Sequence, residues 1–360
     1  MLNKLTIKQA KEGLKSKQFS SIELTRACLD RIKETDEKLN VFVTLTEEQA
    51  LKDAAKADSV LASQGDALEA MPLLGIPIAL KDMFSAKGIQ TTAGSSVLEG
   101  YVSPYDATVV TKLKNAGAVI IGKTNQDAWA HGSSGENSDF GPTKNPWNPE
   151  YVPGGSSSGS AVAVASDMAF AAMGTDTGGS IRLPASFTNT VGLKPTYGRV
   201  SRYGIVAMAS SHDSIGHFTK TVEDSAIFLN VTAGQDPMDA TTADKEIPDY
   251  TKSLSTPLKD LKIGYHKQFF NGEIDNDVAE IYKEAVMKLQ DLGAEIVDLV
   301  SIYSSNYIAS YYIIQPAEVS SNLARYDGIR YGNGRDEFGD EAKRRIMLGT
   351  HALSLGYYDQ

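Results

Sequence analysis

The pattern of apolar and polar positions along this chain of 360 residues changes near residue 70. Before that point, charged residues are mixed with Ala and Leu in segments that are typical of surface helices. Two of these segments open with a capping box, formed by Ser20 with Glu23 and by Thr46 with Gln49. The pattern therefore predicts an N-terminal helical segment, residues 1–70, that packs on the core of the protein.

From Leu73 onward, short apolar runs alternate with helical stretches. The runs read LLGIPIAL from Leu73, AVIIG at 118–122, MAFAAMG at 168–174, LKIGY at 261–265 and AEIVDLV at 294–300. The last two runs enclose apolar residues at helical spacing, which predicts a strand–helix–strand unit; they are Val278, Ile281, Ala285, Leu289 and Leu292. Alternating strands and helices predict an α/β fold with a mixed, mainly parallel sheet that helices cover on both faces.

The segment 71–360 has no evident internal boundary, so we expect it to form a single domain. No internal repeat is present, and the only low-complexity tract is Gly154–Ser160. The least structured part should be Gly234–Pro257, which is rich in Asp, Thr and Pro and which we interpret as a surface excursion.

The composition of the chain excludes several kinds of partner and covalent or metal cross-link. A formal net charge of −10, from 35 basic and 45 acidic residues, gives no general attraction for nucleic acids or anionic membranes. The single cysteine, Cys28, excludes an internal disulfide and a cysteine-based metal cluster. The chain starts without an apolar signal sequence, and its most apolar window, Ala161–Met173, is too short to span a bilayer. We therefore expect a cytoplasmic protein with no membrane contact.

Two short motifs match known patterns but lack the context those patterns need. Gly117–Thr124 fits the phosphate-loop pattern GxxxxGK[ST], but its middle residues, Ala, Val, Ile and Ile, favour a strand. We expect a buried strand there and no nucleotide binding. Gly155–Gly159 fits the hydrolase motif GxSxG, but the turn-forming sequence NPEYVPG stands where an apolar strand is needed. The five histidines show no metal-ligand spacing, so no metal site is expected.

The candidate chemistry lies in residues 153–186, which read PGGSSSGSAVAVASDMAFAAMGTDTGGSIRLPAS. A Gly/Ser-rich turn leads directly into an Ala/Val helix, and a second turn, Thr175–Ser180, follows a small apolar strand. Two such turns at strand and helix ends bring hydroxyls and backbone N–H groups together, as acyl transfer requires. The alternative is a Gly/Ser linker followed by a small-residue helix, and the residue types alone leave both interpretations open.

This stretch resembles the signature of the amidase signature family, GGSS[GS]G followed by a [ST]DTGGSIRxP segment. The resemblance implies that family's fold and its Ser–cisSer–Lys catalytic triad. The nucleophile falls on Ser180, the bridging serine after a cis peptide bond falls on Ser156, and the lysine falls on Lys81 in GIPIALKD. The Gly155–Ser156 bond is therefore expected to be cis, with Ser156 between Lys81 and Ser180.

Such a triad places a physical demand on the lysine. A lysine with its ordinary pKa of about 10.4 is almost fully protonated at pH 7, so a useful base needs a pKa about 3 units lower. The apolar run IPIAL before Lys81 is consistent with the burial that would lower it. The resemblance further implies that no metal or organic cofactor is needed, and that the oxyanion is held by backbone N–H groups of Thr177, Gly178 and Gly179.

Longer segments resemble the A-subunit family of the bacterial Glu-tRNA(Gln) amidotransferases. They are VGLKPTYGRVSRYGIVAMASS, SYYIIQPAEVSSNLARYDGIRYG and DEAKRRIMLGTHALSLGYYD. The resemblance implies a glutaminase that releases ammonia from L-glutamine, with Tyr311 and Arg345 lining the glutamine pocket. It also implies a heterotrimer with subunits B and C, in which a partner uses ATP and Mg to amidate Glu-tRNA(Gln) or, as an alternative, Asp-tRNA(Asn).

The chain also departs from that family. It stops at Gln360, well short of the usual length, and it is shortened between Tyr331 and Phe338. His131 stands where Met is commoner. We therefore expect a C-terminally truncated chain whose substrate pocket lacks its usual last part. Two alternatives follow: a stand-alone amidase for a small carboxamide, and a weakly catalytic chain that acts mainly as a binding partner.

Overall fold

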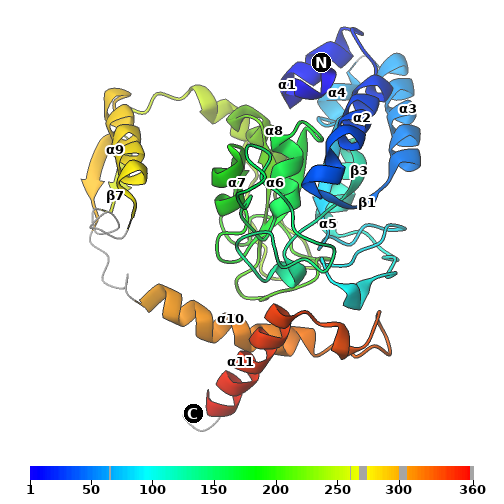
Figure 1. Ribbon diagram of the computed structural model, residues 1–360. Coiled ribbons are helices and arrows are strands. Elements are labelled where there is room, and N and C mark those ends of the chain that lie inside the picture. Colours follow the sequence, from blue (N-terminus) through cyan, green and yellow to red (C-terminus); the bar gives the residue numbers. More distant parts are fainter. Residues whose placement is uncertain (65, 260, 267–273, 300–305, 357–360) are drawn as a thin grey trace. The chain divides into compact units, whose positions relative to one another are not determined.

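The computed structural model describes residues 1–64, 66–259, 261–266, 274–299 and 306–356. They group into two compact units, one formed by Met1–Pro248 with Ile313–Gln360 and one by Asp249–Tyr312 (Figure 1). The expected single domain over residues 71–360 stays a prediction.

The N-terminal part of the first unit is mostly helical. Its helices are η1 (Leu2–Lys4), α1 (Ile7–Lys15), α2 (Ser21–Leu39), α3 (Glu47–Ser63) and α4 (Ala67–Ala70). The capping box at Ser20 is confirmed, since the Ser20 side chain accepts from Glu23 N and the Glu23 carboxylate accepts from Ser20 N. The box at Thr46 is wrong, because the Thr46 hydroxyl donates to Ile120 O at 2.8 Å.

A six-stranded sheet with the order β1-β3-β2-β4-β6-β5 forms the core of the first unit. Its strands are β1 (Phe42–Leu45), β2 (Pro77–Lys81), β3 (Val119–Thr124), β4 (Ala171–Asp176), β5 (Val191–Leu193) and β6 (Ser214–Thr219). The central strands β3, β2 and β4 are parallel, whereas β1, β6 and β5 pair antiparallel with their neighbours. The predicted α/β class with a mixed sheet is confirmed, but the sheet is not mainly parallel, since two of the pairings among its described strands are parallel and three are antiparallel.

Helices flank this sheet so closely that every residue of β2, β3, β4 and β6 is buried. Besides the N-terminal helices, the elements around it are η2 (Ser96–Leu98), α5 (Thr108–Asn115), η3 (Ala128–Ala130), α6 (Ser158–Ala165), α7 (Arg182–Thr188) and α8 (Val222–Thr232). Helix α6 consists of small residues and contacts β2, β3, β4 and β6. A Cβ at Gly159 would lie 2.6 Å from the backbone oxygens of Val41 and Asn125, so this close approach requires glycine.

The strand predicted within Gly117–Thr124 is confirmed as β3, and all of its residues are buried. Lys123 is fully buried in it, and its Nζ donates to Asp82 Oδ1 and to Thr91 Oγ1, each at 2.9 Å. The lysine that a phosphate loop would direct at a ligand is thus used to join β3 to the segment that follows β2.

The second unit contains η4 (Tyr250–Ser255), β7 (Lys262–Tyr265), α9 (Asn276–Asp291) and β8 (Glu295–Asp298). Strands β7 and β8 are parallel, and α9 lies between them in the sequence. The predicted strand–helix–strand unit is therefore confirmed.

The C-terminal elements are α10 (Tyr307–Leu323), η7 (Arg335–Glu337) and α11 (Asp340–Gly356). In the first unit, the Trp129 ring packs against Tyr326 and Phe338, with ring centroids 4.8 and 5.3 Å apart. These aromatic contacts hold the end of the chain against the segment that follows β3. No helix among the described residues combines the length and apolarity needed to cross a bilayer.

Candidate active site

Lys81 lies at the end of the central strand β2, where its side chain is completely buried. Its Nζ donates to Ser156 Oγ and to Thr175 Oγ1, each at 2.8 Å. Burial lowers the pKa of Lys81 to about 7, and the more distant charges of Asp127, Asp213 and Asp176 oppose this shift only partly. The amine therefore has the pKa that a general base at neutral pH requires.

Ser156 follows a cis peptide bond with Gly155, as predicted. Neighbouring backbone holds this turn: Gly155 N donates to Ser133 O at 2.8 Å, and Asp127 N donates to Ser156 O at 3.2 Å. A Cβ at position 155 would lie 2.0 Å from Asp127 Oδ2, so only glycine fits there. The hydroxyl of Ser156 is thereby fixed opposite the Lys81 amine.

Ser180 lies in the turn between β4 and α7 and is 8% exposed, while Gly178 in the same turn is exposed and Gly179 is partly exposed. Its backbone oxygen accepts from Ser157 N at 3.2 Å, which joins the two glycine-rich turns directly. Among the described residues, no hydrogen bond links Ser156 Oγ to Ser180 Oγ. The structure thus forms the Lys81–Ser156 contact and brings the two turns together, while the last link of the expected relay stays a prediction.

Asp176 shapes the turn that carries Ser180. Its carboxylate accepts from Gly179 N at 2.8 Å and Ile181 N at 3.1 Å, and it pairs with the Arg182 guanidinium at 3.0 Å. Burial alone would raise the pKa of Asp176, but the bonds and charge of Arg182 lower it overall. Because Gly179 N–H is committed to Asp176, it is not free for an oxyanion in this arrangement, contrary to the role expected for it.

Asp213 holds the same turn from the opposite side. Its carboxylate is 2% exposed and accepts from Thr177 Oγ1 at 2.7 Å. It also accepts from the backbone N–H of Met208 at 2.9 Å and of Ala209 at 3.2 Å. A single buried carboxylate therefore connects the nucleophile turn to the loop that precedes β6.

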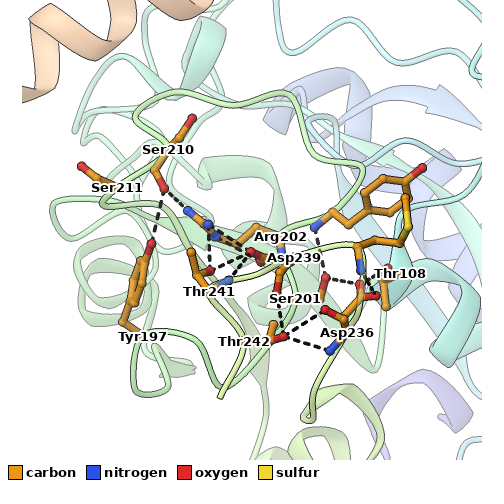
Figure 2. A network of polar contacts seen from close by, with 12 residues as sticks. Thr108, Tyr197, Ser201, Arg202, Ser210, Ser211, Asp236, Asp239, Thr241 and Thr242 are labelled. Atoms are coloured by element: carbon orange, nitrogen blue, oxygen red, sulfur yellow. Dashed lines mark hydrogen bonds and ion pairs between the residues drawn. The ribbon is translucent and has the colours of Figure 1, made fainter. Parts of the chain in front are cut away.

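Figure 2 shows the network that fixes the far side of this loop. The Arg202 guanidinium donates to Ser210 O and pairs with Asp239 at 3.1 Å (Figure 2). Burial would raise the pKa of Asp239, but the bonds from Arg202 and Thr241 hold it well below its usual range. The stretch around Asp236 and Asp239, both buried, is thus anchored, and the prediction of a surface excursion over Gly234–Pro257 is wrong there.

The two residues expected to line the pocket lie in different units. Tyr311 belongs to the unit Asp249–Tyr312, where its ring contacts Tyr312. Arg345 on α11 is 9% exposed, donating to Glu341 Oε1 at 2.8 Å and to Gln315 Oε1 at 2.9 Å. Their roles at the pocket stay predictions.

Sequence reasoning missed the residues that support the triad, namely Asp127, Thr175, Asp176 and Asp213. Thr175 and Asp176 lie inside the TDTGGS motif, so the motif itself held a signal for them. Asp127 and Asp213 lie outside it, and nothing in the local sequence marks their role. Within the part of the chain that is described, no group of three or more His, Cys, Asp or Glu residues is placed to hold a metal ion.

Comparisons with known proteins show what the chain as a whole is similar to. The family model described as Amidase matches residues 23–360. The chain is 52% identical to the A-subunit of the glutamyl-tRNA(Gln) amidotransferase of Trichlorobacter lovleyi, over 98% of this chain and 75% of that protein. It is equally similar to the A-subunit of the Geobacter metallireducens enzyme, at 52% identity over 99% of this chain and 76% of the relative.

Solved structures of related proteins superimpose on this chain. The A-subunit of the glutamyl-tRNA(Gln) amidotransferase of Thermotoga maritima superimposes with a TM-score of 0.79 and 40% identity, over 100% of this chain and 73% of the other. The peptide amidase of Stenotrophomonas maltophilia superimposes with a TM-score of 0.85 and 31% identity, over 98% of this chain and 78% of the other. Both similarities extend over nearly the whole chain.

Proposed function

The chain belongs to the amidase family, and from that premise we propose that it is the glutamine-hydrolysing subunit of a tRNA-dependent amidotransferase. The observation that carries this proposal is the buried Lys81 amine, which lies 2.8 Å from the hydroxyl of the cis-linked Ser156. The identity of 52% to the A-subunit of a glutamyl-tRNA(Gln) amidotransferase supports the choice of substrate.

In the proposed reaction, Ser180 Oγ attacks the side-chain carboxamide carbon of L-glutamine. Neutral Lys81 takes the proton of Ser180 through the hydroxyl of Ser156, which gives one proton and receives another. The negative charge on the carbonyl oxygen is met by backbone N–H groups of the turn, for which Thr177 and Gly178 remain candidates and Ser180 is added as a third. The protonated relay then gives a proton to the departing ammonia, and water hydrolyses the glutamyl ester by the same base.

The released ammonia would serve a second reaction in a complex. We propose subunits B and C as partners in a heterotrimer in the cytoplasm, with ATP and Mg used by a partner. There, Glu-tRNA(Gln) or Asp-tRNA(Asn) would receive the ammonia. The chemistry of the glutaminase step needs acid–base and nucleophilic groups only, all of which the triad supplies.

A stand-alone amidase is the second candidate, and the similarity to a peptide amidase supports it. Ammonia release from L-glutamine by the 360-residue chain, with and without partner subunits and Glu-tRNA(Gln), separates the two. A glutaminase subunit releases ammonia from glutamine and is stimulated by the complex, and its Ser180→Ala variant still supports amidation when free ammonium is supplied. Hydrolysis of simple amides with no glutamine turnover in any assembly would favour the stand-alone amidase instead.

A further inference from the structure

Asp213 is a buried carboxylate that no step of the proposed reaction uses. It lies immediately before β6, 2% exposed, and Thr177 Oγ1 donates to it at 2.7 Å. Thr177 belongs to the turn that ends in Ser180, and the two bonded residues are 36 positions apart in the sequence. The carboxylate is therefore a long-range tie to the turn that presents the nucleophile.

The set of donors around Asp213 requires a carboxylate. Besides the Thr177 hydroxyl, the backbone N–H groups of Met208 and Ala209 donate to it, at 2.9 and 3.2 Å. Burial raises the pKa of Asp213, and these donors oppose that effect. An asparagine would offer one acceptor oxygen and would turn its NH₂ toward donors, so it could not accept the same three hydrogen bonds.

The loop behind Asp213 is fixed from two further directions. The Arg202 guanidinium donates to Ser210 O (Figure 2), and the Glu318 carboxylate on α10 accepts from Ser211 N at 2.9 Å. With its loop held in this way, Asp213 cannot follow a displacement of the turn. The position of Thr177, and of the backbone that follows it, is thereby set from outside the turn.

We propose that Asp213 is a positioning residue for acyl transfer, which holds Thr177 so that the backbone N–H groups of Gly178 and Ser180 point at the developing oxyanion. This inference rests on the proposed function, because it takes Ser180 as the nucleophile. Asp176 shapes the turn from within through Gly179 N, and Asp213 fixes it against the sheet. The two carboxylates have separate tasks.

The charge of Asp213 should affect the pH dependence of the rate, which a purely structural role would leave unchanged. Three carboxylates raise the pKa of Lys81 against burial: Asp127 after β3, Asp213 before β6 and Asp176 at the end of β4. The direct partners of the amine, Ser156 and Thr175, are neutral hydroxyls. Removal of the Asp213 charge should therefore shift the acid limb of the pH–rate profile to lower pH.

The test compares Asp213→Asn with Thr177→Val in the 360-residue chain, by kcat and KM for ammonia release from L-glutamine. Both variants should lower kcat, at most by the roughly 10²–10³-fold that loss of an oxyanion donor costs, with KM changed less than about threefold. Only Asp213→Asn should also move the acid limb to lower pH, because Thr177→Val keeps the charge. Asp213→Glu should recover the acid limb but not the full kcat.

Asp236→Asn is the matched control, since Asp236 is a buried aspartate whose partners, Ser201 and Thr108, lie outside the turn. It should lower stability and leave kcat and the pH profile unchanged. Unaltered kcat in Thr177→Val, or an Asp213→Asn variant that behaves like Asp236→Asn, overturns the inference. If Asp213→Asn does not fold, Thr177→Val alone decides.

Failure of the proposed function would be visible separately, as no ammonia release by the wild-type chain. In that case, the rate at which phenylmethanesulfonyl fluoride modifies Ser180 carries the test. A slower modification in Asp213→Asn and Thr177→Val, with an altered pH dependence only in Asp213→Asn, supports the positioning role. Equal rates in wild type and both variants reject it.

Discussion

Two fully buried lysines lie on neighbouring parallel strands, Lys81 at the end of β2 and Lys123 on β3. The strand register places Lys123 opposite Leu80, so the two lysines are nearly level in the sheet. Lys123 Nζ lies 2.9 Å from the Asp82 carboxylate, whereas Lys81 Nζ donates to the hydroxyls of Ser156 and Thr175. Burial lowers the pKa of both amines, but the Asp82 carboxylate in direct contact with Lys123 opposes this shift, whereas the direct partners of Lys81 are neutral hydroxyls.

The sequence order of these groups is misleading. Asp82 follows Lys81 directly, yet it pairs with Lys123, which is 41 residues away. Asp82 lies in the turn just after the end of β2, and its carboxylate also accepts from Thr92 N at 2.8 Å. The carboxylate next to Lys81 in the sequence is therefore held by other partners, and no hydrogen bond joins it to the Lys81 amine among the described residues.

The largest effect expected from this comparison is on catalysis. Lys81→Ala should lower kcat for glutamine hydrolysis by roughly 10²–10⁴-fold, the range for loss of a general base, because Ser180 remains without its activator. The residual rate should rise with pH as hydroxide replaces the amine. Ammonia release measured from pH 6 to pH 10 checks this, and a variant with unaltered activity would remove Lys81 from the mechanism.

Next in size is the effect of the second lysine on stability. Lys123→Met leaves the Asp82 carboxylate buried without its cation, which should cost about 3–5 kcal/mol of unfolding free energy. The double variant Lys123→Met/Asp82→Asn should recover part of this loss, since no charge is then left unpaired. Urea unfolding of the three proteins measures both effects. A single variant as stable as wild type would show that the ion pair has no structural role.

A smaller effect of opposite sign is expected for Lys81. Its pKa of about 7 lies below the unfolded value, so the unfolded chain binds more protons between these two values and stability rises with pH. Lys81→Met removes this cost and should stabilise the protein by roughly 1–3 kcal/mol at pH 6, after the loss of two hydrogen bonds is counted. At pH 10 the gain should disappear. Thermal unfolding at both pH values gives the comparison, and a variant less stable at pH 6 than wild type would contradict it.

The smallest effect concerns a buried group that has neither kind of partner. His131 is fully buried, and neither ring nitrogen has a hydrogen-bond partner among the described residues. Burial, helped by the positive charge of Arg345, holds the pKa of His131 well below its usual range, so the ring is neutral. His131→Met should therefore raise the unfolding free energy by about 1 kcal/mol or slightly more.

His217 is the control for that substitution. It is equally buried, but its Nε2 forms a hydrogen bond with Ser225 Oγ at 2.8 Å. His217→Met should accordingly destabilise the protein, by about 1–3 kcal/mol for the partner left unsatisfied. The same sign of change in both variants, measured by urea unfolding, would show that hydrogen bonding does not separate the two histidines.

The sequence was sufficient to predict features that depend on short local motifs. It was insufficient to predict features that depend on contacts between distant segments. Ser156 and Ser180 were expected because the glycine-rich motifs resemble a family signature, whereas the residue types alone left a linker interpretation open. Asp213 was not predicted as a site residue, because its proposed role depends on Thr177, a partner 36 residues away. Strand β1 was not predicted for a related reason. Only four residues form it, and it pairs antiparallel with the distant strand β3 at the edge of the sheet. The Thr46 cap failed because a tertiary acceptor, Ile120 O, competed for its hydroxyl.

The bonds of the Lys81 amine also have a consequence for how the protein is made. Its two partners lie 75 and 94 residues further along the chain, so the base acquires its environment only after β4 has been synthesised. At a translation rate of about 5–20 residues per second, this delay is roughly 5–20 s. During it, Lys81 is hydrated and carries an ordinary ammonium charge. Under the proposed mechanism, the emerging chain therefore carries no activated nucleophile until β4 and the turn that follows it, which contains Ser180, have been synthesised.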